Sequence, residues 1–159
     1  MSRPRKHLRV ELVSRPTSIG LPVRCVHEGD EADLSQLMFA AYRGSIDDDG
    51  ESLSDAEQSV RTTLHGGHGY FLADCSFVAL DDGHPAAGTL VTMLHKEPLL
   101  AQVLTAPTWK RRGLARALIQ LSMNALVARG ETELSLVVTS GNEPAERLYQ
   151  DLGFSNRYA

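Results

Sequence analysis

The sequence predicts an α/β domain with a mixed, mostly antiparallel sheet. Three short apolar segments in the middle of the chain, residues 76–80, 87–94 and 99–105, are separated by turn residues, which is typical of an antiparallel meander. A helical pattern and another strand pattern follow, and a strand, helix, strand unit most often forms a right-handed parallel crossover. Two helical patterns precede most of the sheet. We therefore expect about six to seven strands flanked by about four helices.

The elements before the meander are two short strands and two helices. Residues 8–13 alternate like a strand, and residues 23–27 are the next candidate strand. Apolar residues recur at the helical period over residues 33–44, which predicts an amphipathic helix. Ser54, with Glu57 three positions later, is typical of a capping box and predicts that a second helix begins there and continues to Leu64.

The elements after the meander alternate between helix and strand. Leucines line a helix that follows the third meander strand and ends at Gly130, a residue suited to the left-handed conformation of a helix end. A β-branched strand over residues 134–138 follows. The last helix covers residues 143–152, with a proline in its first turn and a glycine after its end.

The composition is that of a single globular domain. The chain has 159 residues, 42% of them hydrophobic, with a formal net charge of −4. No apolar run approaches the roughly 20 residues of a membrane helix, and no apolar stretch follows the basic residues near position 5, so we expect no secretory signal and a cytoplasmic location. Prolines punctuate residues 1–20, which we expect to form an N-terminal extension, and residues 21–159 form the expected domain.

Charge and metal-ligand patterns exclude several classes of function. Residues 28–57 contain ten acidic residues and one basic residue. This favours a cationic or amine partner, and we expect neither a nucleic-acid nor a membrane partner. Cys25 and Cys75 lack the spacing of a disulfide framework or a zinc site. His65 and His68 have no nearby carboxylate or cysteine, which favours a flexible loop, so we expect no metal.

The segment that carries chemistry lies at residues 107–116, between the third meander strand and the long helix. The first N–H groups of a helix have no internal acceptor, and the helix dipole adds about half a positive charge there. Small residues, Gly113 and Ala115, let an anion approach the backbone. Four basic side chains surround this bend: Lys110, Arg111, Arg112 and Arg116. The segment predicts a phosphate or pyrophosphate cradle, with a solvated basic helix start and a DNA-recognition helix as alternatives.

This bend resembles the acetyl-CoA-binding motif of the GNAT superfamily of N-acetyltransferases. The family pattern is Gln or Arg, two residues, Gly, one residue, then Gly or Ala, a few residues after a proline. Here it reads Lys110-Arg111-Arg112-Gly113-Leu114-Ala115 after Pro107, with Lys at the first position. A second stretch matches the family's last helix: Asn142, Ala145, Leu148-Tyr149 and Leu152-Gly153-Phe154. The resemblance is specific over residues 99–154.

The resemblance implies a sheet that splays in the middle, with the pantetheine arm of acetyl-CoA in the gap. A strand bulge commonly opens this gap, although the sequence shows none. The residues implied in coenzyme binding are Val103, Leu104, Thr105, Lys110, Arg111, Arg112, Gly113, Leu114, Ala115, Arg116 and Asn142. A helix cap is the alternative role for Asn142. A backbone N–H near Leu104 or Thr105 would meet the oxyanion.

The implied reaction is direct attack of an amine on acetyl-CoA in a ternary complex. Tyr149 occupies the family position of the general acid, and a phenol with a pKa near 10 can protonate a departing thiolate. The alternative is a packed aromatic residue. An alternative for the whole domain is an acyl-CoA-binding sensor or structural domain without turnover. The acceptor can be a small-molecule amine or a peptide amine, and the sequence does not decide between them. A homodimer is a further possibility, because members of the family are often dimers.

The general base is not assigned by the sequence. Positions that hold a Glu in some relatives are Leu99 and Leu100 here. The candidates are His95, Glu97, a water held by Gln102, and an acid of the loop at residues 47–51. Tyr42 and that acidic loop are expected at the rim of the acceptor site.

Overall fold

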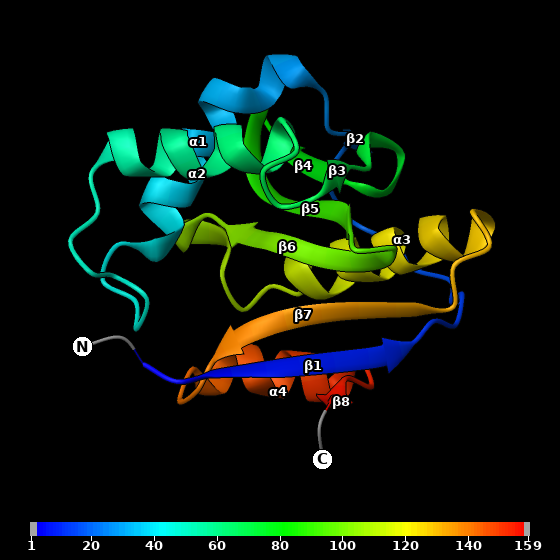
Figure 1. Cartoon of the computed structure of the whole chain (residues 1–159). Coiled ribbons are helices and arrows are strands. Elements are labelled where there is room, and N and C mark those ends of the chain that lie inside the picture. Colours follow the sequence, from blue (N-terminus) through cyan, green and yellow to red (C-terminus); the bar gives the residue numbers. More distant parts are fainter. Residues whose placement is uncertain (1–2, 158–159) are drawn as a thin grey trace.

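The computed structural model describes residues 3–157 as an open sheet with helices on both faces (Figure 1). The elements are β1 (Arg5–Glu11), β2 (Val23–Cys25), α1 (Glu31–Tyr42), α2 (Leu53–Leu64), β3 (Tyr70–Phe71), β4 (Phe77–Asp81), β5 (His84–Leu94), β6 (Glu97–Thr105), α3 (Leu114–Ala128), β7 (Glu133–Thr139), α4 (Glu143–Asp151) and β8 (Ser155–Asn156). Single-turn helices lie at Glu28–Asp30, Ala73–Cys75 and Pro107–Trp109.

Within residues 3–157 the sheet has eight strands in the order β2-β4-β5-β6-β7-β1-β8, with β3 also paired to β5. Every pair is antiparallel except β6 with β7, which is parallel and is connected through α3. The mixed, mostly antiparallel sheet and the four longer helices are therefore confirmed. The sheet exceeds the expected strand number because β3 and β8 have two residues each, too few to show an alternating pattern.

The two middle strands diverge, as the resemblance implied. The parallel ladder between β6 and β7 holds a single residue pair, Leu99 with Ser135. On its other side, β6 pairs Gln102 with Leu90 but Leu100 with Val91, so Ala101 is an extra residue. Such a bulge bends the strand that contains it. In Figure 1, β6 and β7 separate toward the end at which β6 leads into α3.

The first strand begins earlier than the sequence suggested and lies inside the sheet. The pattern placed a strand at residues 8–13 within an extension, whereas β1 covers Arg5–Glu11 and pairs with β7 and β8. Leu8 and Val10 are its buried residues. The preceding basic residues are exposed, so their side chains give no hydrophobic signal, but their backbone still joins the ladder with β7.

The capping box of α2 was predicted two residues too late. Helix α2 begins at Leu53, after the cap residue Ser52, whose hydroxyl accepts a hydrogen bond from the Asp55 N–H at 3.2 Å. The Asp55 carboxylate accepts in return from the Ser52 N–H at 2.9 Å. The prediction required Glu at the third helical position, and Asp performs the same reciprocal bond here.

The core occupies both faces of the sheet. Leu90 and Leu104 are buried with α1 and α2 on one face, whereas Val91 and Leu100 are buried with α3 on the other. This separation follows from the alternation of side chains along β5. Figure 1 shows α3 and α4 behind the strands that flank the gap. Between positions 3 and 157, no helix has the length and apolar content needed to cross a membrane.

Candidate coenzyme and acceptor site

The bend before α3 has the geometry of an anion cradle. Gly113 caps the helix in the left-handed conformation, with φ 80° and ψ 6°, and Arg111 is also left-handed, with φ 65°. The hydrogen bond from Ala117 N–H to the Gly113 carbonyl, at 3.1 Å, closes the first helical turn. The three N–H groups before Ala117 therefore lack helical acceptors. A Cβ added to Gly113 would meet nothing within 4 Å, so this face of the bend is open.

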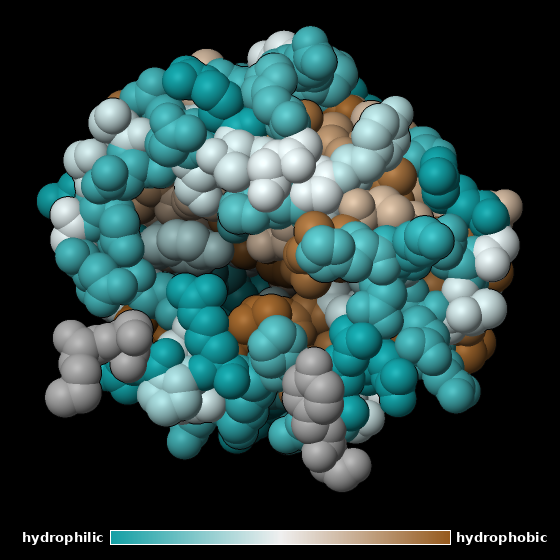
Figure 2. Space-filling model, in the orientation of Figure 1, coloured by the Kyte–Doolittle hydropathy of each residue, from teal (hydrophilic) through white to brown (hydrophobic). Residues whose placement is uncertain are grey.

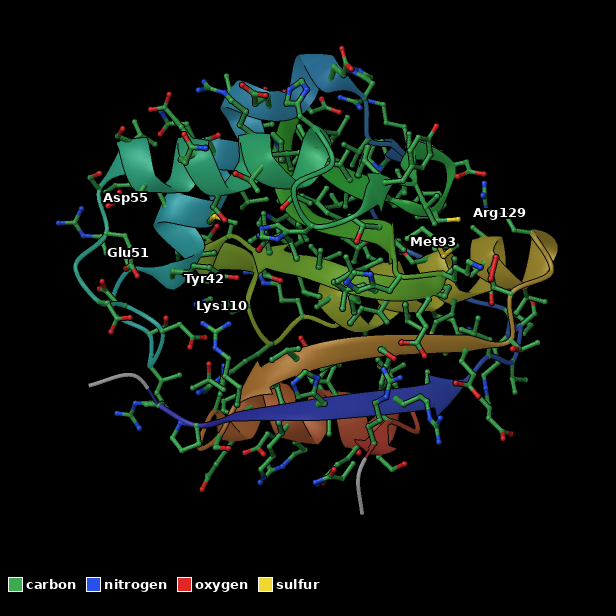
Figure 3. All side chains as sticks on the ribbon, in the orientation of Figure 1. Tyr42, Glu51, Asp55, Met93, Lys110 and Arg129 are labelled. Atoms are coloured by element: carbon green, nitrogen blue, oxygen red, sulfur yellow. The ribbon has the colours of Figure 1, made fainter. Side chains whose placement is uncertain are left out.

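The basic side chains of the bend have different environments. Arg111 is exposed, and the Arg112 guanidinium lies 4.8 Å from the centre of the Trp109 ring. Arg116 forms an ion pair with Asp151 at 3.6 Å. Lys110, which departs from the family pattern, donates from Nζ to the Ala41 carbonyl at 2.9 Å, so its amine lies at the end of α1 (Figure 3). The bend is therefore tied to the helix that precedes the acidic loop.

The remaining predicted coenzyme residues border the gap. Val103, Leu104 and Thr105 pair with β5 on one side, and β7 provides no ladder partner to them on the other. Leu104 is buried, and the other two are half-buried. Asn142 is the cap residue of α4, and its Oδ1 accepts a long hydrogen bond, 3.4 Å, from the Ala145 N–H. The structure thus shows the capping role, and the coenzyme contacts stay predictions.

Tyr149 is half-buried on α4, with its ring against Phe154. The ring centres are 5.8 Å apart and the ring planes make an angle of 65°. Burial raises the pKa of Tyr149 strongly, and the nearby Tyr42 and Asp47 raise it further. The phenol is therefore neutral at physiological pH, which is the form that a general acid requires, and burial makes it a weaker acid than a free tyrosine. Tyr42 and Asp47 both line a cleft between α1, α2, β6 and β7.

A cleft with a volume of about 780 Å³ lies along the bulged strand, and its lining holds more acidic than basic side chains. It lies between α1, α2, the loop that joins them, and strands β6 and β7. Its charged lining residues are Arg5, Arg43, Asp47, Asp48, Asp49, Glu51 and Asp55. Figure 2 shows a hollow in the corresponding face, and Figure 3 places Tyr42, Glu51 and Asp55 at the same end of the molecule. The predicted rim is therefore part of this cleft.

A polar network crosses the floor of the cleft. The Tyr42 hydroxyl donates to Oε1 of Gln102 at 3.4 Å, and Nε2 of Gln102 donates to the Ser59 hydroxyl at 3.3 Å. The Thr139 hydroxyl donates to Oδ1 of Asp47 at 2.7 Å, which fastens the acidic loop to the end of β7. Ser59 and Thr139 belong to no sequence motif, so no local pattern marks them as site residues.

The structure separates the candidates for the general base. Gln102 and the acidic loop line the cleft, whereas His95 and Glu97 do not. Glu97 lies at the beginning of β6 and accepts a hydrogen bond from Arg157 at 2.8 Å, which lowers its pKa. A carboxylate held in this way is a weak base. Among residues 3–157, no group of three or more His, Cys, Asp or Glu is placed to hold a metal ion.

The ionisation of Tyr42 predicts a loss of stability in alkali. Burial, together with the nearby Asp47, raises the pKa of Tyr42 to about 12. An unfolded tyrosine has a pKa of about 10, so the unfolded state releases this proton first. The stabilising contribution is complete below pH 10 and is lost as the pH rises to about 12. In urea titrations from pH 9 to 12, Tyr42→Phe should lose less unfolding free energy than the wild type. Equal pH slopes would contradict this interpretation.

Comparisons of sequence identify the family to which these features belong. The family model described as Acetyltransferase (GNAT) family matches residues 36–154. The ribosomal protein bS18-alanine N-acetyltransferase of Escherichia coli strain K12 is 32% identical over 80 residues, which are 50% of this chain and 54% of that protein. This chain spans about half the length of the curated relatives it matches.

Solved structures agree with this assignment at the level of the fold. The ribosomal-protein-S18-alanine N-acetyltransferase from Escherichia coli matches with a TM-score of 0.66 and 23% identity, over 83% of this chain and 76% of that chain. The PaiA N-acetyltransferase from Thermoplasma acidophilum, solved in complex with coenzyme A, matches with a TM-score of 0.66 and 13% identity, over 86% and 91%. Because the family model covers more than half of the sequence, the chain belongs to the GNAT acetyltransferase family.

Proposed function

We propose that the protein is an N-acetyltransferase that transfers the acetyl group of acetyl-CoA to an amine by direct attack in a ternary complex. The gap between β6 and β7 carries this proposal. The open bend at Gly113 lies at its α3 end, and the acidic cleft extends along the bulge at Ala101. An elongated thioester bound through its pyrophosphate at the bend can thus direct its acyl end toward an amine in the cleft. Acetyl-CoA supplies the acetyl group that is transferred to the amine.

The open amides of the bend fit a pyrophosphate. The N–H groups of residues 111–115 and the adjacent basic side chains provide donors and positive charge at a helix N-terminus. Gly113 leaves the approach clear. The backbone of Val103 and Thr105, which faces the gap, is proposed to pair with the pantetheine arm. Of the two expected oxyanion donors, Leu104 directs its N–H toward β5, in line with the bond from Ala106 N–H to the Ala86 carbonyl, so Thr105 is proposed to donate its N–H to the oxyanion.

The reaction needs one group that accepts a proton from the amine and one that donates a proton to the thiolate. An alkylamine with a pKa near 10 must lose a proton before it attacks, which costs about 4 kcal/mol at pH 7. Gln102, through a bound water, or an acid of the loop at residues 47–51 is proposed to receive this proton. Tyr149 stays protonated because burial raises its pKa, and it is proposed to protonate the departing thiolate.

The acceptor class is an amine, and a peptide N-terminus is one candidate. The curated relatives are alanine N-acetyltransferases of a ribosomal protein, so an N-terminal alanine belongs in the first panel of acceptors. Small amines belong there too, because the acidic cleft suits any cation. The proposed location is the cytoplasm.

Thiol release tests the function. The purified protein is mixed with acetyl-CoA and a panel of amines, including a peptide that begins with alanine, and free thiol is measured against a hydrolysis blank. The proposal requires thiol release with at least one acceptor. An enzyme and an acyl-CoA sensor would both gain about 2.7 kcal/mol of stability at a hundred times the dissociation constant of CoA. Only the sensor would release no thiol above the blank.

A further inference from the structure

The segment between β1 and β2 is fastened to α3 by two amide side chains. Asn124 accepts at Oδ1 from the Arg15 N–H at 2.9 Å and donates from Nδ2 to the Arg15 carbonyl at 2.7 Å. Gln120 donates from Nε2 to the Val13 carbonyl at 3.2 Å and to Oδ1 of Asn124 at 2.9 Å. Gln120 is only 7% exposed, so a buried polar group is used to hold an otherwise exposed loop. The backbone of Arg15 is therefore fixed on both sides.

This fastened segment forms one wall of a second cavity, with a volume of about 580 Å³. The other walls are the first turns of α3, including Gly113 and Arg116, and the end of α4 at Asp151 and Gly153. The size falls within the range of about 300 to 1,000 Å³ typical of small-molecule sites. No lining residue of this cavity lines the acceptor cleft.

The cavity lies where the nucleotide of the coenzyme would lie, beyond the pyrophosphate that the bend is proposed to bind. If the pyrophosphate lies on the bend and the pantetheine arm lies in the gap, the nucleotide must leave the bend in the other direction. Gly113 belongs to both the bend and the cavity, so the cavity begins where the pyrophosphate would end. Coenzyme A carries a further phosphate on its ribose, and a cationic partner for that phosphate would lie beyond Gly113.

Two arginines on different walls supply positive charge to this cavity. Arg15 projects from the fastened segment and Arg116 from α3, with Asp151 as the opposing carboxylate. The ion pair between Arg116 and Asp151, at 3.6 Å, joins side chains that are 55% and 52% exposed. An exposed pair of this kind contributes little stability. A phosphate can therefore compete with Asp151 for Arg116 without a large cost.

We propose that residues 15–18 form the outer wall of the nucleotide end of the coenzyme site, and that Arg15 and Arg116 bind the 3′-phosphate of coenzyme A. This inference rests on the proposed function, because it takes coenzyme A as the ligand. It gives the segment before β2 a role in recognition, and it explains the pair of amides on α3. Gln120 and Asn124 act as positioning residues, since they hold the backbone that carries Arg15.

Calorimetric titrations with CoA and 3′-dephospho-CoA test the assignment. The wild type should bind CoA about tenfold or more tightly than dephospho-CoA, since a charge-assisted bond to phosphate is lost in the latter. Arg15→Ala should weaken CoA about tenfold and leave dephospho-CoA unchanged. Arg129→Ala is the matched control, because it removes the same charge from the far end of α3, where Arg129 pairs with Asp74. Its affinities should equal those of the wild type.

The clamp is tested by Asn124→Ala, which retains Arg15 but frees its backbone. This variant should reduce the preference for CoA over dephospho-CoA, with circular dichroism confirming an intact fold. Equal binding of the two ligands by the wild type, or an unchanged preference in Arg15→Ala, would overturn the inference while the proposed function stood. A wild-type protein that bound neither ligand would overturn the proposed function, and this inference with it.

Discussion

A Gly113→Val variant is expected to lose at least about a hundredfold in CoA affinity, because it removes two or more charge-assisted bonds of about 1.5 to 3 kcal/mol each. Two physical causes act together. Gly113 has φ 80°, which a β-branched residue adopts only with strain. The position is also open, so the new side chain would project over the face where the pyrophosphate is proposed to bind. Calorimetry with CoA measures the loss.

The matched control is Gly130→Val, at the other end of the same helix. Gly130 has φ 89° and, like Gly113, would place a new Cβ with nothing within 4 Å. Both variants should therefore lose similar unfolding free energy in urea, whereas only Gly113→Val should lose CoA affinity. A similar affinity loss in both variants would assign the effect to strain in α3. Unchanged CoA affinity in Gly113→Val would contradict the proposal that this bend binds the pyrophosphate.

The order of the elements could be predicted from the sequence because periodicity and turn residues are local. The meander, the crossover helix α3 and the last helix α4 all appear where their patterns placed them. Element boundaries were less certain because caps admit several residue types. The box at Ser52 uses Asp55, and the similar pattern at Ser54 lies inside the helix.

Features that depend on strand pairing could not be predicted in the same way. The bulge at Ala101 is defined only by the register of β6 against β5, since Leu90 pairs with Gln102 and Val91 with Leu100. The place of β1 between β7 and β8 likewise depends on partners more than 120 positions away. Neither fact is encoded in the pattern of a single strand.

The cradle could be predicted from the sequence, whereas the acceptor cleft could not, because only the cradle is formed by neighbouring residues. The cradle is one continuous segment, so its glycine, basic residues and helix start could be recognised together. The acceptor cleft combines side chains from α1, α2, β6, β7 and the acidic loop, and contacts such as that of Thr139 with Asp47 join residues 92 positions apart. The cradle residue Lys110 also makes a non-local contact, with Ala41, which its motif position did not reveal.

A Tyr149→Phe variant is expected to lower turnover by about 10² or more while CoA affinity is retained. The substitution removes only the hydroxyl, and the ring can keep its edge contact with Phe154. Burial raises the pKa of Tyr149, so the wild-type phenol keeps its proton across the working pH range. Steady-state thiol release, together with calorimetry for CoA, separates the loss of the acid from a loss of binding.

The control for this substitution is Tyr70→Phe, because Tyr70 is 75% exposed and does not line either cavity. Tyr42→Phe provides a second comparison, since the Tyr42 hydroxyl lies in the cleft but bonds to Gln102. If Tyr149 protonates the thiolate, its variant should be slowest with poor leaving groups, and a thioester of a more acidic thiol should recover part of the rate. A wild-type rate with acetyl-CoA would remove the general-acid role from Tyr149. A loss of turnover in Tyr42→Phe alone would assign the general-acid role to Tyr42 instead.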